Sequence, residues 1–156
     1  MNNEALRTNW RKQWLESIYE FASLKLQNMS WVEGPSANWA GGEAWCSSYV
    51  ECFCKYFDDL SLSKGHGGYE TVISEGLLTS EEASLASHFH VIADNYSRLI
   101  DNDLFVIEDP NWKPVVQAAI ELWHHLKNSL TSINDLSVIK NLEEKFGYIP
   151  SQGITK

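Results

Sequence analysis

Residues 79–101 read TSEEASLASHFHVIADNYSRLID and decide the fold class. Thr79 and Glu82 have the spacing of a capping box, in which each side chain accepts a hydrogen bond from the backbone N–H of the other residue. Downstream, apolar side chains recur at spacings of four and three residues, at Leu85, Phe89, Ile92, Tyr96 and Leu99. This spacing lays one apolar stripe along a helix, so we predict a long amphipathic helix that ends near Asp101.

Helical spacing also occurs upstream of this stretch. Residues 4–27 predict a first helix, with an apolar stripe at Leu6, Trp10, Trp14, Ile18, Phe21 and Leu24 or Leu26. Residues 28–42 contain glycine, proline and small polar residues, which indicate a loop. A second helix is predicted over residues 43–60, with an inner face of Trp45, Tyr49, Cys52 or Phe53, Tyr56 and Leu60. The glycine-rich residues 64–68 then form a connector to a short helix over residues 69–78.

Downstream, Leu104 to Ile107 could form a brief extended piece between two helices. The sequence Asp109-Pro110-Asn111-Trp112 signals another helix start, since the first-turn N–H groups of a helix have no partner within it and tolerate Pro114. This helix runs to about Leu130 with an inner stripe of Val115, Ala119, Leu122, Trp123 and Leu126. A final helix over residues 134–146 has core positions at Leu136, Ile139 and Leu142 and ends at Gly147 in a C-cap position.

These patterns predict an all-α fold, a single-domain bundle of five or six helices. With 156 residues, of which 44% are hydrophobic, the chain can bury one core and is too short for two ordinary domains. We therefore expect residues 1–150 to form one helical domain and residues 151–156 to form a flexible C-terminal tail. No alternating strand pattern or βαβ unit is present in the sequence.

The formal net charge of −9 is concentrated in the middle of the chain. The segments carry +1 over residues 1–27, −4 over 28–63, −7 over 64–111 and +1 over 112–156. No cluster of lysine and arginine exists that could neutralise a phosphate backbone, so we expect no direct binding to nucleic acid. The charge favours a basic partner, although acidity can equally serve solubility alone.

We expect a cytoplasmic protein that does not enter a membrane. No basic segment followed by a cleavable apolar stretch opens the chain, and its apolar runs are only a handful of residues long. The three cysteines, Cys46, Cys52 and Cys54, are odd in number and lack the paired C-x-x-C spacing of a zinc site. The sequence therefore predicts a reducing compartment, no cofactor and no bound metal.

Two patterns that contain histidine are considered as metal sites because of their spacing. Glu121 and His124 match the E-x-x-H spacing of carboxylate-bridged di-metal bundles, but such a site needs two copies of the motif. Both positions fall opposite the apolar stripe of their helix and should face solvent. His88 and His90 flank the inward Phe89, so on a helix their side chains point roughly 200° apart and cannot chelate one ion together.

Residues 42–49, GEAWCSSY, are similar to the nucleophile segment of papain-superfamily peptidoglycan amidases, in which a Trp-Cys pair begins a helix. The resemblance would make Cys46 a catalytic thiol. That chemistry also requires a histidine delivered by a strand, and the histidines of this sequence lie in a glycine-rich loop or on predicted helices. The alternative is a small cysteine that packs on a helix between Trp45 and Tyr49.

From Tyr69 onward, a series of short motifs occurs in a fixed order, namely residues 76–83, Phe89-His90, Asp94-x-Tyr96, Asp109-Pro110-x-Trp112, Val115-Val116 and Ala118-Ala119. This order of features resembles small helical bacterial immunity proteins of contact-dependent or polymorphic toxin systems. They cover a little over a third of the chain and consist mostly of caps and core positions. The resemblance implies a protein that binds a cognate toxin, often a basic nuclease, and blocks its active site.

The resulting hypothesis is an immunity protein that neutralises a basic, nuclease-type toxin by direct binding and catalyses no reaction. The candidate binding residues are acidic groups of the middle segment, Glu70, Glu75, Asp94, Asp101, Asp103, Glu108 and Asp109. Trp31 and Trp39 join them if either is exposed, because buried aromatic anchors usually carry affinity. Two alternatives remain at this point, a cysteine hydrolase that uses Cys46 and a non-catalytic helical scaffold.

Overall fold

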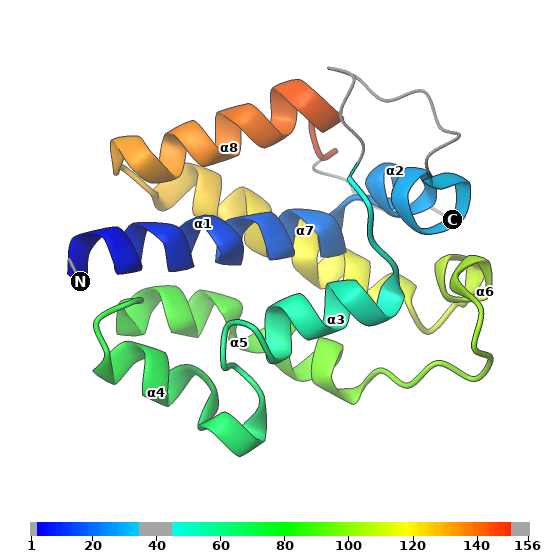
Figure 1. Cartoon of the computed structure of the whole chain (residues 1–156), viewed down its shortest axis with the longest axis horizontal. Coiled ribbons are helices and arrows are strands. Elements are labelled where there is room, and N and C mark those ends of the chain that lie inside the picture. Colours follow the sequence, from blue (N-terminus) through cyan, green and yellow to red (C-terminus); the bar gives the residue numbers. More distant parts are fainter. Residues whose placement is uncertain (1–2, 35–44, 151–156) are drawn as a thin grey trace.

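The structure is a computed structural model that describes residues 3–34 and 45–150 (Figure 1). The described residues form α-helices and shorter helical turns. The elements are α1 (Asn3–Ala22), α2 (Leu24–Gln27), the π-helical turn η1 (Asn28–Glu33), α3 (Tyr49–Phe57), the 3-10 turn η4 (Lys64–His66), α4 (Gly68–Ser74), α5 (Ser80–Asn95), α6 (Asp103–Glu108), α7 (Lys113–Ser129) and α8 (Ile133–Phe146). The predicted all-α class is confirmed, but the described residues contain eight α-helices where the sequence predicted five or six.

Helix α1 lies at the centre of the bundle, where it packs against α7, α8 and α3. Helix α5 packs against α7 on one side and α4 on the other, and α6 packs against η1. Figure 1 shows α8 on one side of α1 and α3 with α5 on the other, while α4 and α6 lie at opposite ends of the molecule. None of the helices in the described part of the chain combines the length and the apolar character needed to cross a membrane.

The core is rich in aromatic side chains that several helices contribute. Phe21 of α1 lies 5.0 Å from Phe89 of α5 and 5.9 Å from Trp112, measured between ring centroids. The predicted stripe of α7 is buried in full. The predicted stripe of α1 is fully buried from Trp14 to Phe21, whereas Trp10 is half-buried and Leu6 is 49% exposed.

The capping box is confirmed. The Thr79 hydroxyl accepts from the Glu82 N–H at 3.1 Å, and the Glu82 carboxylate accepts from the Thr79 N–H at 3.0 Å. Helix α8 also ends as predicted, at Gly147, whose φ of 112° favours glycine. Local side-chain chemistry therefore sets these two helix ends.

Two other predicted boundaries are wrong. Helix α3 begins at Tyr49, because Ser48 is extended and its hydroxyl caps the Glu51 N–H at 3.0 Å; of the preceding residues, 43–44 lie outside the described part of the chain. Helix α5 ends at Asn95 and does not reach Asp101. The next residue, Tyr96, turns out of the helix and packs its ring 4.9 Å from Trp112.

The short helices account for the larger number of elements. Residues 104–107, expected to be extended, form most of α6, which Asn102 caps by accepting from the Phe105 N–H at 3.0 Å. Ser23 interrupts the predicted first helix and caps the separate helix α2. Three residues placed in predicted apolar stripes are exposed instead, namely Leu85 at 37%, Leu99 at 78% and Leu136 at 41%.

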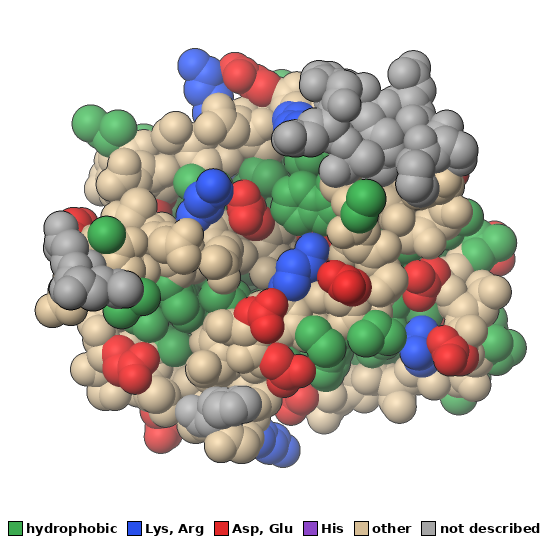
Figure 2. Space-filling view, in the orientation of Figure 1, with side chains coloured by type: hydrophobic (Ala, Val, Ile, Leu, Met, Phe, Trp, Pro, Cys, Tyr) green, Lys and Arg blue, Asp and Glu red, His purple; other side chains and the backbone are tan. Residues whose placement is uncertain are grey.

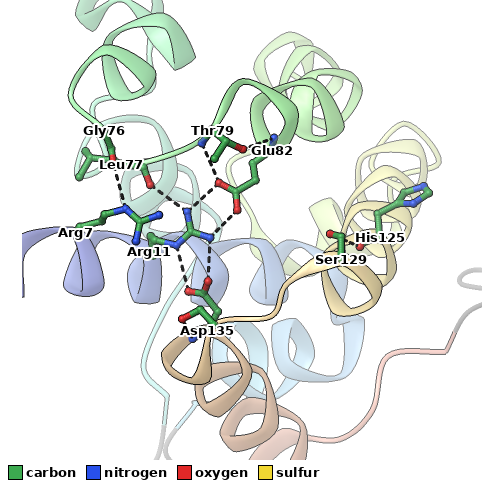
Figure 3. A network of polar contacts seen from close by, with 10 residues as sticks. Arg7, Arg11, Gly76, Leu77, Thr79, Glu82, His125, Ser129 and Asp135 are labelled. Atoms are coloured by element: carbon green, nitrogen blue, oxygen red, sulfur yellow. Dashed lines mark hydrogen bonds and ion pairs between the residues drawn. The ribbon is translucent and has the colours of Figure 1, made fainter. Parts of the chain in front are cut away.

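A buried arginine holds three helices together (Figure 3). Arg11 of α1 is 4% exposed, and its guanidinium donates to both carboxylate oxygens of Glu82 and both of Asp135. It also donates to the Leu77 carbonyl at 3.1 Å. Because Glu82 lies on α5 and Asp135 on α8, this one side chain fixes α1 against both helices.

A chain of polar groups connects α1, α4, α3 and α5. The Trp14 indole N–H donates to the Tyr69 hydroxyl at 3.0 Å, and that hydroxyl lies 2.6 Å from the Tyr56 hydroxyl. The Tyr56 hydroxyl lies 2.9 Å from Nδ1 of His90. Since an indole can only donate, every group is satisfied when Tyr69 donates to Tyr56 and Tyr56 donates to His90. This arrangement requires a neutral His90 with its proton on Nε2.

Because these hydrogen bonds require a neutral His90, we expect the protein to be less stable in mild acid than at neutral pH. Burial lowers the pKa of His90, although the Asp94 carboxylate raises it in part. The unfolded chain therefore binds a proton at this residue before the folded protein does. The stability that neutral His90 supports is complete above the unfolded pKa of about 6.5 and falls as the pH drops toward the lowered folded pKa.

The free energy of urea unfolding, measured from pH 7.5 to pH 5, tests this expectation. The variant His90→Gln keeps an acceptor and cannot titrate, so its stability should fall less with acid than that of the wild type. His88→Gln is the matched control, because His88 lies two residues away on α5 and is exposed. Parallel pH profiles for the wild type and His90→Gln would contradict the assignment.

Candidate protein-binding surface

The fold separates the acidic residues that the sequence grouped together. Glu70 on α4 and Glu75 just after it are exposed at one end of the molecule. Asp101, Asp103 and Glu108 lie beside or on α6 at the opposite end (Figure 1). These five residues therefore do not form one patch, and Glu70 and Glu75 cannot contact the same small epitope as the α6 group.

Asp109 is a structural residue, which corrects its place among the binding candidates. It is 3% exposed, and its carboxylate accepts from the Tyr96 hydroxyl at 2.8 Å and from the Asn111 N–H at 2.9 Å. It therefore fixes the turn before α7 and is not available to a partner. Asp94 is half-buried on α5, where its carboxylate raises the pKa of His90 in part.

Trp31 was a binding candidate only if it is exposed, and it is buried. It is 8% exposed, its ring centroid lies 6.0 Å from that of Trp112, and its indole N–H donates to Glu20 at 2.9 Å. It is a core residue. Trp39 lies outside the described residues.

Helix α3 and the residues just after it supply exposed acidic side chains that were not among the binding candidates predicted from the sequence. Its inner face is buried at Tyr49, Cys52 and Tyr56, while Glu51 on the helix and Asp58 and Asp59 just after it are exposed. The predicted inward positions of this helix already implied that these three acids face outward. The three acids were missed because residues 64–111 carry more negative charge.

A single arginine joins α3 to the α6 end of the molecule. The Arg98 guanidinium lies 5.1 Å from the centroid of the Tyr49 ring, so the loop before α6 packs on the start of α3. Arg98 also pairs with Asp101 at 3.0 Å and with Asp103 at 3.8 Å. We call Glu51, Asp58, Asp59, Asp101 and Asp103 the acidic surface.

The acidic surface keeps a negative charge, because its five carboxylates meet few cations. Arg98 is shared between two of them, and the Asp101 side chain remains 91% exposed. Lys55 of α3 points its amine to the buried Glu20, 2.8 Å away. Figure 2 shows acidic side chains spread over the face that α3 crosses, with only a few basic ones among them.

Glu20 anchors the chain under this surface. The carboxylate is fully buried and accepts from the indole N–H groups of Trp31 at 2.9 Å and Trp45 at 3.3 Å. The Lys55 amine, paired with the same carboxylate, lies 4.9 Å from the centroid of the Trp45 ring. A hollow of about 210 Å³ beside these groups is lined by Gln13, Glu16, Ser17, Glu20, Trp45, Lys55 and Asp59. The cluster fixes the segment that leads into α3 against α1.

Cys46 does not begin a helix. It is exposed in the irregular segment 45–48, and α3 starts three residues later at Tyr49. The expected placement of this thiol at a helix N-terminus, on which the hydrolase resemblance depends, is therefore wrong. Cys52 is buried, and burial raises the pKa of its thiol well above the ordinary value.

The histidines are dispersed over the described part of the chain. Within it, no three His, Cys, Asp or Glu side chains come together in a way that could hold a metal ion. Glu121 faces solvent as predicted and accepts from Gln117 at 3.2 Å. His124 is half-buried, so its predicted exposure is only partly right, and its Nε2 atom is shielded from solvent without a hydrogen-bond partner.

Comparison of the chain with protein-family models, curated proteins and solved structures finds no match. A functional hypothesis must therefore rest on the chemistry of the surface and on the sequence resemblance described above.

Proposed function

We propose that this protein is a cytoplasmic immunity protein that binds a basic toxin domain, of the nuclease type, and blocks it by direct contact. The acidic surface carries this proposal. It presents five carboxylates on or just after α3 and just before or at the start of α6, in a protein whose net charge is −9. The sequence resemblance to toxin immunity proteins supplies the class of partner.

The electrostatics of such a surface suit capture of a basic protein. A nuclease concentrates cationic side chains where it binds the phosphate backbone. An acidic inhibitor is attracted to that region over long range, which accelerates encounter, and it then occupies the groups that the substrate needs. The charge therefore contributes mainly to the association rate and to the choice of partner.

Charge reversal on the acidic surface should slow association with the toxin domain. Each of Glu51→Lys and Asp101→Lys should act mildly, and the double variant should reduce the association rate about tenfold at low salt. The difference should shrink as salt rises, because the Debye length falls from about 10 Å at 0.1 M to about 3 Å at 1 M. Surface plasmon resonance against the purified, catalytically inactive cognate toxin domain measures both effects.

Two control reversals test whether position matters. Glu144→Lys changes an exposed residue on α8, and Glu70→Lys changes an exposed residue at the α4 end. Both should affect association much less than the double reversal. Equal losses from reversals anywhere, or an association rate insensitive to salt, would show that the acidity serves solubility alone. Failure of the wild-type protein to bind the toxin domain would overturn the proposed function.

A further inference from the structure

Three large apolar side chains project into solvent at the α6 end of the molecule. Leu99 is 78% exposed, Ile100 is 53% exposed and Leu104 is 43% exposed. Single exposed apolar residues are common on protein surfaces, but three within six positions of the chain form a local cluster. We call these three residues the apolar tip. Figure 2 shows exposed hydrophobic side chains beside acidic ones toward this end.

The apolar tip is held in place by contacts on both sides of it. Before the tip, Arg98 stacks on Tyr49 and pairs with Asp101. Within it, the Asn102 N–H donates to the Ile100 carbonyl at 2.8 Å, and the Asn102 side chain caps α6. Because the backbone is fixed before binding, a partner would lose little free energy in ordering this loop.

The tip is not needed to complete the core. Val106 supplies the buried side chain of α6, and Tyr96 anchors the start of the loop through Asp109. The three tip residues are exposed to solvent. A hollow of about 370 Å³ is lined by Ile92, Asn95, Tyr96, Ser97, Asn111 and Val115. Of these residues, Ser97 is two positions before Leu99 in the sequence.

We propose that the apolar tip is the affinity anchor of the interface and inserts into an apolar socket, rimmed by lysine or arginine, on the basic partner. The inference rests on the proposed function and deepens it. Charge complementarity identifies the occupant, because Asp101 lies between Ile100 and Leu104 and Asp103 directly precedes Leu104. A cationic rim would pair with these carboxylates while the socket buries the apolar side chains.

A second copy of this chain is a poorer partner for the apolar tip, because the charges of Asp101 and Asp103 would then oppose binding. Pairing two tips would bring Asp101 and Asp103 of one copy against the same residues of the other. Each copy also has a net charge of −9, so the approach is opposed over long range. The tip therefore fits a partner of opposite charge.

Polar replacement of the tip tests the inference. In the double variant Leu99→Ser/Ile100→Ser, the dissociation constant for the inactive cognate toxin domain should rise at least thirtyfold, mostly through faster dissociation. This loss should persist at high salt, unlike the loss from charge reversal. The matched control is Ile133→Ser/Leu136→Ser on α8, where the side chains are 85% and 41% exposed and belong to no acidic surface. The control should bind like the wild type.

The possible outcomes distinguish failure of this inference from failure of the proposed function. If the tip variant and the control bind equally well, the inference is overturned and the proposed function stands. If the wild type does not bind the toxin domain, both are overturned. If sedimentation shows a wild-type dimer that the tip variant abolishes, the tip is a self-association surface and the assignment to a basic partner is wrong. Urea unfolding should be the same for the wild type and both variants, since the replaced side chains lie outside the core.

Discussion

Replacing Arg11 with methionine should lower the free energy of unfolding by about 3–5 kcal/mol. The side chain is 4% exposed, and its five donated hydrogen bonds range from 2.7 to 3.2 Å. Methionine fills similar space but leaves the carboxylates of Glu82 and Asp135 facing each other without a cation. Burial alone would raise the pKa of Glu82, yet its bonds to Arg11 and Thr79 hold that pKa below its ordinary value.

Arg7 provides the matched control for this experiment. It lies one turn earlier on α1, is half-buried, and donates to the Gly76 carbonyl at 3.0 Å (Figure 3). Arg7→Met should cost less than about 1.5 kcal/mol. Arg11→Lys should also be destabilising, because an ammonium cannot bond both carboxylates in the planar geometry of a guanidinium. Urea unfolding followed by tryptophan fluorescence measures all three, and similar losses for Arg7→Met and Arg11→Met would contradict the central role of Arg11.

Features set by neighbouring residues could be predicted from the sequence. The Thr79–Glu82 capping box, the apolar stripe of α7 and the end of α8 at Gly147 all depend on residues within one or two helical turns of each other. The errors arose where contacts distant in sequence override the local pattern. Tyr96 continues the helical spacing, but its contact with Asp109 and Trp112 takes it out of α5.

The polar clusters could not be predicted, for the same physical reason. Arg11 bonds residues that lie 66 to 124 positions away, and no local pattern identifies such partners. At the candidate surface, the sequence indicated the sign of the charge but not its position. The fold places Glu70 far from Asp101 and buries Asp109, while it exposes Glu51, Asp58 and Asp59 on and just after α3.

Glu20 shows how a charged residue can be essential to a core. Replacing it with alanine should lower the free energy of unfolding by about 3 kcal/mol or more. The change would leave the indole N–H groups of Trp31 and Trp45 and the Lys55 amine without their shared acceptor, and it would open a cavity on α1.

Glu16 is the control for Glu20, one turn earlier on the same helix. It is half-buried and lines the same hollow, and burial raises the pKa of its carboxyl, although nearby lysines oppose the rise. Because this carboxylate accepts no hydrogen bond from the indole groups of the described residues, Glu16→Ala should cost less than about 1 kcal/mol. Glu20→Ala should also shift tryptophan emission to longer wavelength as Trp45 loses its anchor, whereas Glu16→Ala should not. Equal stability losses, or an unchanged spectrum in Glu20→Ala, would mean that packing alone holds the segment leading into α3.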